Sequence, residues 1–274
     1  LFEKKYAEAA ALAKQVIDGS NFSLNPNYPS NFYKPDQNAS REIMFSVKFQ
    51  LPNIEHVDAS LAVSLQTWKG ELGTQDLIDE YEANDPRKTM TFFFAGDGKE
   101  QGWPYTDPAV GTPGSQSWLP GFYAVKKWLT PGLVNPDYGD HGNNDFVFLR
   151  FADVKLMYAE AQNEAVGPDA TVYAQVNEVR ARPGVDMPAL TAGLSKEAMR
   201  ERIRHERRVE FAMEGLRYFD LRRWGLATEK LNGFVQNPLA PTIKTKYEDK
   251  YEFWPIPQTE IDRNNPVLIQ NPNY

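Results

Sequence analysis

Near the start of the chain, hydrophobic positions follow a helical pattern. Apolar residues recur there every three or four positions and share one face: Phe2, Tyr6, Ala9, Ala13 and Val16 or Ile17. This spacing predicts a helix from Leu1 to Asp18, with Gly19 as the residue that stops it.

Three later segments alternate between apolar and polar positions, as strands do. They cover residues 42–50, 89–94 and 122–128. One side of the first segment carries Ile43, Phe45, Val47 and Phe49. We expect that side to face the core and the other side to face solvent.

Helical spacing returns at residue 149. One apolar stripe is formed by Leu149, Ala152, Leu156 and Ala159, and it ends at Gly167-Pro168. Asp169 is a good cap for a second helix that continues to about Arg182. Because the turn is so short, the two helices must lie antiparallel. The tetrapeptide Tyr-Ala-Glu-Ala, found at residues 6–9 and again at 158–161, suggests a repeated hairpin of the tetratricopeptide kind.

The segment from Ser195 to Gly225 combines a helix cap, an apolar stripe and a row of carboxylates. Ser195 is the expected cap, and the stripe consists of Met199, Ile203, Phe211 and Tyr218. The carboxylates Glu206, Glu210 and Glu214 follow one another at intervals of four, where like charges repel.

Such a charged row can be a solvated helix face or a buried ionic lattice. The apolar residues around it leave little face for solvent, which favours the lattice, and an unpaired buried charge costs roughly 3–5 kcal/mol. We therefore expect arginines of the same segment to pair with it: Arg207, Arg208, Arg217, Arg222 and Arg223. On this interpretation Glu206, Arg207, Glu210, Glu214 and Arg217 are scaffold rather than an active site.

Composition and charge argue against several classes of function. The 274 residues carry a net charge of −7, with no block of like charge, so the sequence offers no basic patch for nucleic acid. Cysteine is absent, which excludes disulfides and thiolate chemistry in this chain. No apolar run is long enough to span a membrane.

The sequence contains no recognisable catalytic motif. His56, His141 and His205 are too far apart for metal-ligand spacing, and no phosphate-binding loop is present. Glycoside hydrolysis needs two opposed carboxylates. Asp76, Asp79 and Glu80 are conceivable candidates, but clustered acids in so polar a segment are usually solvated. We therefore expect no enzyme, no catalytic residue and no cofactor.

One oxygen-rich loop resembles a calcium site in composition: it contains Asp137, Asp140, Asn143, Asn144 and Asp145. The loop lacks EF-hand spacing, and Asp, Asn and Gly are ordinary turn formers. We therefore predict a turn and no metal, with a structural calcium near Asp137–Asp145 as the open alternative.

Four blocks along the chain share one further property. They are residues 148–161 (FLRFADVKLMYAEA), residues 176–182 (VNEVRAR), residues 206–223 (ERRVEFAMEGLRYFDLRR) and residues 254–274, which begin WPIP and end QNPNY. In sequence and in order, they resemble the SusD/RagB family of nutrient-binding lipoproteins from Bacteroidetes. Asn273 stands where the family usually has glycine, and asparagine also tolerates a left-handed backbone.

The resemblance implies a mostly α fold in which tetratricopeptide-like helical hairpins support an irregular, loop-rich region with a few short strands. It implies one SusD-like domain, of which this chain would be the later portion. Within it we expect a repeat helix at 1–20, a loop and strand ligand-binding region at 21–148, a helical scaffold at 149–230 and the C-terminal family motif at 231–274.

The resemblance further implies a glycan-binding protein at the cell surface, working with a TonB-dependent, SusC-like transporter. A lipid anchor upstream of this chain would hold the full-length protein on the outer membrane. A helical-repeat module that binds peptide or protein is the alternative, and a glycoside hydrolase is the third.

Aromatic residues in polar, Gly- and Pro-rich segments are the candidate ligand contacts. Sugar rings stack on such side chains, so we predict contacts from Trp68, Trp103, Tyr105 and Trp118. Hydroxyl groups would be bound by Asp97, Gln101 and Gln116. The alternative is that these rings only pin long loops to the scaffold. The remaining tryptophans (Trp128, Trp224 and Trp254) lie in apolar or family blocks, and we expect them in the core.

Overall fold

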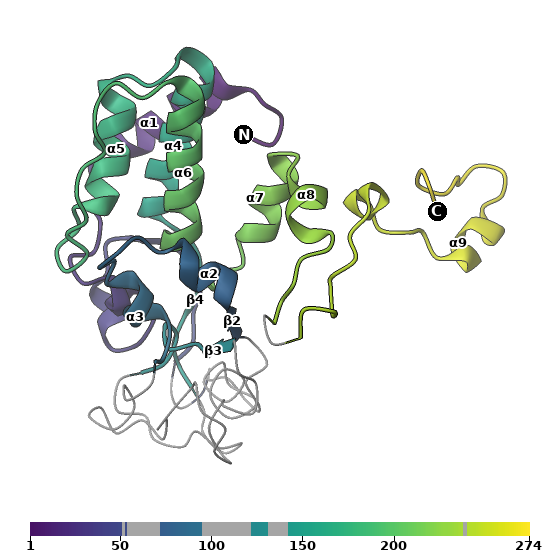
Figure 1. Cartoon of the computed structure of the whole chain (residues 1–274), viewed down its shortest axis with the longest axis horizontal. Coiled ribbons are helices and arrows are strands. Elements are labelled where there is room, and N and C mark those ends of the chain that lie inside the picture. The colour runs from purple at the N-terminus through teal and green to yellow at the C-terminus, as the bar shows by residue number, and fades with distance from the viewer. Residues whose placement is uncertain (51–52, 54–71, 95–121, 131–141, 238–239) are drawn as a thin grey trace. The chain divides into compact units, whose positions relative to one another are not determined.

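The computed structural model describes residues 1–50, 53, 72–94, 122–130, 142–237 and 240–274 (Figure 1). It divides into two compact units, Leu1–Leu216 and Arg217–Tyr274. The fold is mostly α with a few short strands, as predicted.

The first unit contains six α-helices and four strands among its described residues. The helices are α1 (Tyr6–Asp18), α2 (Gln75–Glu80), α3 (Arg87–Thr91), α4 (Phe151–Val166), α5 (Ala170–Arg180) and α6 (Lys196–Glu210). The strands are β1 (Ile43–Val47), β2 (Leu72–Thr74), β3 (Phe122–Ala124) and β4 (Phe146–Arg150). Two antiparallel sheets result, one of β1 and β4 and one of β2 and β3.

Helix α4 is the centre of the helical layer and packs against α1, α5 and α6 (Figure 1). The repeated Tyr-Ala-Glu-Ala segments meet here, because Ala9 of α1 packs against a buried cluster that includes Tyr158 and Ala161 of α4. The small alanines let the two helices approach closely. Helix α1 begins at Tyr6 rather than at Leu1, because Lys4 adopts a left-handed backbone with φ 55°.

Both predicted helix caps are confirmed. The side chain of Asp169 accepts hydrogen bonds from the backbone amides of Thr171 and Val172 at the start of α5. The Ser195 side chain accepts one from Ala198 at the start of α6. Helices α4 and α5 pack against each other as the hairpin required.

The apolar stripe of the third helix is only partly confirmed. Met199 and Ile203 are fully buried, and Phe211 is buried just beyond the end of α6. The stripe does not continue to Tyr218, because Met213 and Gly215 take left-handed backbone angles that break the helix. Tyr218 belongs to the second unit.

Two strand predictions and one helix prediction were wrong. Residues 89–94 form the end of α3 and then a single bridge from Phe92 to Val125, rather than a strand. Strand β3 stops at Ala124 instead of reaching residue 128. Leu149, expected in a helix, lies in β4, since its backbone pairs with β1.

The predicted orientation of β1 was also wrong. Phe45 and Val47 are 61% and 42% exposed, whereas Ile43 packs against the core. The pairing with β4 shifts register between Ile43 and Phe45 and again between Phe45 and Ser46. Such a bulge changes which face a side chain points to, so a uniform alternation read from the sequence fails here.

A large aromatic core lies beside these strands. It includes Tyr28, Phe32, Phe92, Phe93 and Trp128, all of them buried. Trp128 is therefore a core residue, as predicted. Its indole nitrogen donates to the backbone oxygen of Met213, 3.0 Å away.

The described residues of the second unit form three short α-helices: α7 (Arg217–Arg223), α8 (Ala227–Leu231) and α9 (Gln258–Arg263). Leu221, Ala227 and Tyr247 form its core, with Trp224 packed against it as expected. Trp254 was wrongly assigned to the core, since it is 90% exposed. Asn273 has φ 70°, in the left-handed region anticipated for this position.

Among the described residues, no helix combines the length and apolar character needed to cross a membrane.

Candidate functional site

The seven predicted ligand contacts all lie outside the described residues. They are Trp68, Trp103, Tyr105, Trp118, Asp97, Gln101 and Gln116. Their role stays a prediction.

The described residues on either side of these segments are tied together. The amide of Phe93 donates to the oxygen of Ala124 at 2.9 Å, which joins the chain before residue 95 to the chain after residue 121. The side chain of Asn144 donates to the backbone oxygen of Trp128 at 3.1 Å. This bond joins the chain before residue 131 to the chain after residue 141. The described residues that flank these two segments are therefore held close together.

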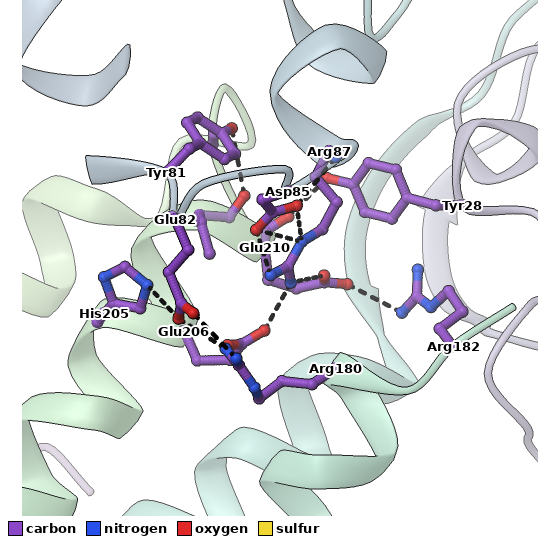
Figure 2. Close-up of polar contacts among 12 residues, drawn as sticks. Tyr28, Tyr81, Glu82, Asp85, Arg87, Arg180, Arg182, His205, Glu206 and Glu210 are labelled. Carbon is purple, nitrogen blue, oxygen red and sulfur yellow. Dashed lines mark hydrogen bonds and ion pairs between the residues drawn. The ribbon is translucent and has the colours of Figure 1, made fainter. Parts of the chain in front are cut away.

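The most highly charged part of the described chain is a buried ionic lattice around Glu210 (Figure 2). We define this lattice by its members: the acids Glu42, Asp85, Glu206, Glu210 and Glu214, and the cations Arg87, Lys127, Arg150, Arg180 and Arg182. The Glu210 carboxylate is within 2.7–2.9 Å of Arg87, Arg150 and Arg182. All four side chains are essentially inaccessible to solvent.

Neighbouring acids extend the lattice in both directions. Glu206 pairs with Arg87 at 2.6 Å and with Arg180 at 2.8 Å. On the other side Arg150 also reaches Glu42 and Glu214, at 2.7 and 2.8 Å. Each of these carboxylates is thereby shared between two or more cations, which is what makes so much buried charge tolerable.

The burial of Glu206, Glu210 and Glu214 confirms the prediction of a lattice, and the cations that pair with them here lie outside the segment 195–225. Arg207 pairs with Asp153, and Arg208 pairs with Asp76 and Glu80. Arg217, Arg222 and Arg223 belong to the second unit. Partners for the row come from elsewhere in the unit, because neighbours on one helix project in different directions and cannot all reach the same seam.

Ionisation in the lattice follows from its geometry. Burial alone would raise the pKa of Glu210, but Arg182, Arg150 and Arg87 hold it well below the usual range. Glu214 behaves in the same way: burial raises its pKa, and Arg150 with Lys127 lowers it below the ordinary value. These carboxylates are fixed as anions.

Lys127 responds to burial in the opposite direction. Loss of water lowers its pKa to about 8, although Glu214 opposes the shift. Its ammonium group donates to the backbone oxygens of Glu210 and Ala212 and to the Glu214 carboxylate. It also lies 4.5 Å from the centre of the Phe32 ring.

The lattice is a poor place for chemistry. Glu206 and Glu210 are buried and paired on every side, so no substrate can reach them from solvent. The acids once considered for hydrolysis are also engaged: Asp76 and Glu80 pair with Arg208, and Asp79 accepts from Gln75. We assign the lattice a structural role.

The oxygen-rich loop at residues 137–145, predicted to be a turn with calcium as the alternative, is described only from Gly142 onward. There Asp145 is buried and paired with Lys34 at 2.8 Å and Lys48 at 2.7 Å. Asn144 accepts from the amide of Lys34 and donates to Trp128. Among the described residues no group of His, Asp and Glu side chains is arranged to hold a metal ion.

A row of aromatic rings runs across the outer face of the β1–β4 sheet, and sequence analysis missed it. Phe45 and Phe148, which is 53% exposed, lie with ring centres 5.8 Å apart. Phe148 contacts Phe146 edge to face at 4.9 Å. The signal in the sequence was the aromatic density of residues 45–49 and 146–148; the side of the first segment that carries Phe45 was expected to face the core.

A small hollow of about 210 Å³ lies between α1, α4 and α5, lined by residues such as Lys14, Tyr158 and Gln175. Small-molecule sites typically enclose roughly 300–1,000 Å³. The hollow is therefore a modest candidate for ligand binding.

The family model described as the SusD family matches residues 7–274, so the chain belongs to the SusD family. This confirms the resemblance drawn from the four sequence blocks.

Curated relatives are longer than this chain. It is 26% identical over 219 residues to SusD-like protein P2 of Formosa agariphila, a match that covers 76% of this chain and 41% of that protein. It is 34% identical over 151 residues to SusD-like protein P25 of the same organism, covering 54% of this chain and 27% of the relative.

Solved structures share the fold. A SusD-like protein from Bacteroides fragilis aligns with a TM-score of 0.79 at 25% identity, over 100% of this chain and 62% of that one. A SusD-like carbohydrate binding protein from the same species aligns with a TM-score of 0.75 at 24% identity, over 95% of this chain and 61% of that one. Surface glycan-binding protein A from Bacteroides thetaiotaomicron, in complex with laminarihexaose, aligns with a TM-score of 0.67 at 19% identity, over 98% of this chain and 61% of that one.

Proposed function

We propose that this protein binds an oligosaccharide and does not alter it chemically. The observation that carries the proposal is membership of the SusD family over residues 7–274, together with structural relatives that are described as carbohydrate binding or hold laminarihexaose. The lattice supports the non-catalytic part, because the most concentrated carboxylates of the described chain are sealed from solvent.

The cellular setting belongs to the same proposal and rests on the family resemblance. The protein works at the cell surface, held on the outer membrane by a lipid anchor in its full-length form. It passes the bound glycan to a TonB-dependent, SusC-like transporter. Binding must then be moderate, since a ligand that is never released cannot be transported.

The proposed division of labour follows the regions expected from the sequence. Residues 149–230 supply the helical scaffold, and residues 21–148 supply ligand contacts. Trp103 and Trp118 are the first tryptophans to test, with Trp68 and Tyr105 after them. Their rings would stack on sugar faces, while Asp97, Gln101 and Gln116 would bind hydroxyl groups.

The test is isothermal titration calorimetry of the protein with a panel of oligosaccharides that includes laminarihexaose. We expect one class of glycan to bind, and Trp103→Ala and Trp118→Ala to weaken that binding about tenfold or more, as loss of an aromatic anchor does. Trp254→Ala is the matched control, because Trp254 is a fully displayed tryptophan outside the proposed ligand region.

Three results would overturn parts of this proposal. Absence of binding to every glycan, with binding of peptides instead, would replace it with the peptide-binding alternative. Cleavage of a bound glycan would restore the hydrolase. Equal losses from Trp254→Ala and the two loop variants would remove the assignment of Trp103 and Trp118.

A further inference from the structure

We propose that the outer face of the β1–β4 sheet is an oligosaccharide-stacking surface, formed by Phe45 and Phe148 and bordered by Val47 and Phe146. We call these four residues the outer aromatic face. The inference rests on the proposed function and adds contacts to those expected from Trp103 and Trp118.

The first argument is that these rings face outward against the hydrophobic pattern. Strand β1 alternates as if Phe45 belonged to the buried side, yet the register shifts on both sides of Phe45 turn it toward solvent. Bulges are features that re-aim particular side chains and are frequent next to functional sites. The two rings are adjacent and form one contiguous apolar surface, which is the kind of exposure that accompanies ligand-binding sites.

The second argument is the geometry of the pair. The Phe45 and Phe148 rings are 5.8 Å apart and inclined by 35°, so they form a shallow surface rather than a closed sandwich. The C–H face of a pyranose ring is flat and apolar and matches such a surface. Its hydroxyl groups point sideways, and next to β1 lies the polar residue Lys48, whose side chain is 68% exposed and whose ammonium pairs with Asp145.

The third argument is rigidity. Phe146 stacks on Trp128, with ring centres 5.5 Å apart and planes within 6° of parallel. Trp128 in turn contacts the buried Phe32 ring edge to face at 5.0 Å. The exposed rings are thus the outer end of an aromatic row that begins in the core.

The same two strands are also fixed by the ionic lattice. Arg150 ends β4 and pairs with Glu42, the residue before β1. A surface held in place before binding loses little conformational entropy when a ligand arrives. The lattice therefore contributes to binding indirectly, by holding the strands that carry the rings.

The size of the face favours a sugar over a protein partner. An aromatic side chain contributes roughly 150–250 Å² when fully buried, so two half-exposed phenylalanines and one valine offer about 250–300 Å². A stable protein interface requires about 800 Å² per partner. One or two sugar rings need far less contact area than a protein does. They stack on a flat aromatic ring, which a branched aliphatic side chain does not provide.

The requirement for a flat ring can be tested by mutation. Phe45→Leu and Phe148→Leu keep an apolar side chain of similar volume and remove the flat ring. Phe2→Leu is the control, because Phe2 is 62% exposed, as Phe45 is, and lies near the start of the chain. Affinity for the best oligosaccharide of the panel is measured by calorimetry, and direct contact by saturation transfer from aromatic protons to the sugar.

We expect each leucine variant to bind about tenfold more weakly, with unchanged thermal unfolding, and Phe148→Tyr to retain affinity. The Phe2→Leu control should bind as the wild type does. Saturation transfer to the sugar should decrease in Phe45→Leu and in Phe148→Leu.

The outcomes separate the two proposals. If the wild type binds an oligosaccharide and both leucine variants bind it equally well, the Phe45 and Phe148 rings do not stack on the sugar and the proposed function stands. If no oligosaccharide of the panel binds to the wild type, both proposals are overturned. Retained affinity in the leucine variants together with loss in Phe148→Asp would show a generic apolar contact in place of sugar stacking.

Discussion

Strands β1 and β4 carry two contrasting environments, the ionic lattice and the outer aromatic face. Arg150 and Glu42 at the ends of the strands are charged and buried, whereas Phe45 and Phe148 on the outer surface are apolar and exposed. Both arrangements reverse the usual preference of their residue types. The difference teaches that charge serves stability here and apolar surface serves recognition.

The largest expected effect comes from removing the charge at the centre of the lattice. Glu210→Gln keeps the shape of the side chain but leaves Arg87, Arg150 and Arg182 short of one negative charge. We expect a loss of about 3–5 kcal/mol in the free energy of unfolding, or failure to fold, measured by urea denaturation. Glu201→Gln is the control, since Glu201 forms an exposed pair with Arg204 that is worth less than about 1 kcal/mol.

Acid should weaken the lattice without any mutation. The pKa values of the lattice residues Glu210 and Glu214 are lowered by their cations. Glu82 lies outside the lattice as defined but pairs with its member Arg180; partial burial raises the pKa of Glu82, and Arg180 and Arg202 lower it to about 2. The stability these groups provide is therefore complete above about pH 4.5 and is lost as the pH falls toward 2.

We expect a loss of about 2–4 kcal/mol over that range, with Glu82 contributing less than its shift suggests because solvent screens it. Denaturation in urea at pH 6, 4 and 3 measures the change. A profile that is flat down to pH 3 would show that the carboxylates are not fixed as anions.

A smaller and opposite effect is expected at alkaline pH. Burial lowers the pKa of Lys127 to about 8. Above pH 8 the folded protein therefore releases a proton that the unfolded chain keeps, because an unfolded lysine has its ordinary, higher pKa. Stability should therefore rise by about 1–2 kcal/mol between pH 8 and 10, relative to Lys127→Met. Identical pH profiles for wild type and variant, again from urea denaturation, would mean that Lys127 keeps its proton.

The smallest effect is expected on the outer aromatic face. Phe148→Ser should change the free energy of unfolding by no more than about 0.5 kcal/mol, because the ring is already half in water. Phe32→Ala is the comparison within the same aromatic row, and it should cost about 3–5 kcal/mol because Phe32 is fully buried. Thermal melts of the two variants measure both losses of stability. Similar losses for Phe148→Ser and Phe32→Ala would contradict the contrast between the exposed and the buried ring.

The helical scaffold could be predicted from the sequence because its signals are local. Ser195 and Asp169 cap the helices they precede, and the burial of Glu210 followed from the apolar residues around it. The lattice partners could not be predicted, since Arg87 lies 123 residues from Glu210 and Arg150 lies 60 residues away. Sequence spacing carries no information about contacts so distant.

The candidate site was harder for a different reason. The exposure of Phe45 depends on register shifts against β4, and a shift of one residue moves a side chain to the other face of a sheet. Alternation within β1 alone cannot reveal this. Trp103 and Trp118 were chosen because their surroundings show no pattern, and they lie outside the described residues.

A crystal structure of the protein with its best-bound oligosaccharide tests the central claim most directly. The account predicts a sugar ring lying against Phe45 and Phe148, with the lattice around Glu210 unchanged and free of ligand. A sugar in contact with Glu206, Glu210 or Glu214, with the outer aromatic face empty, would contradict it.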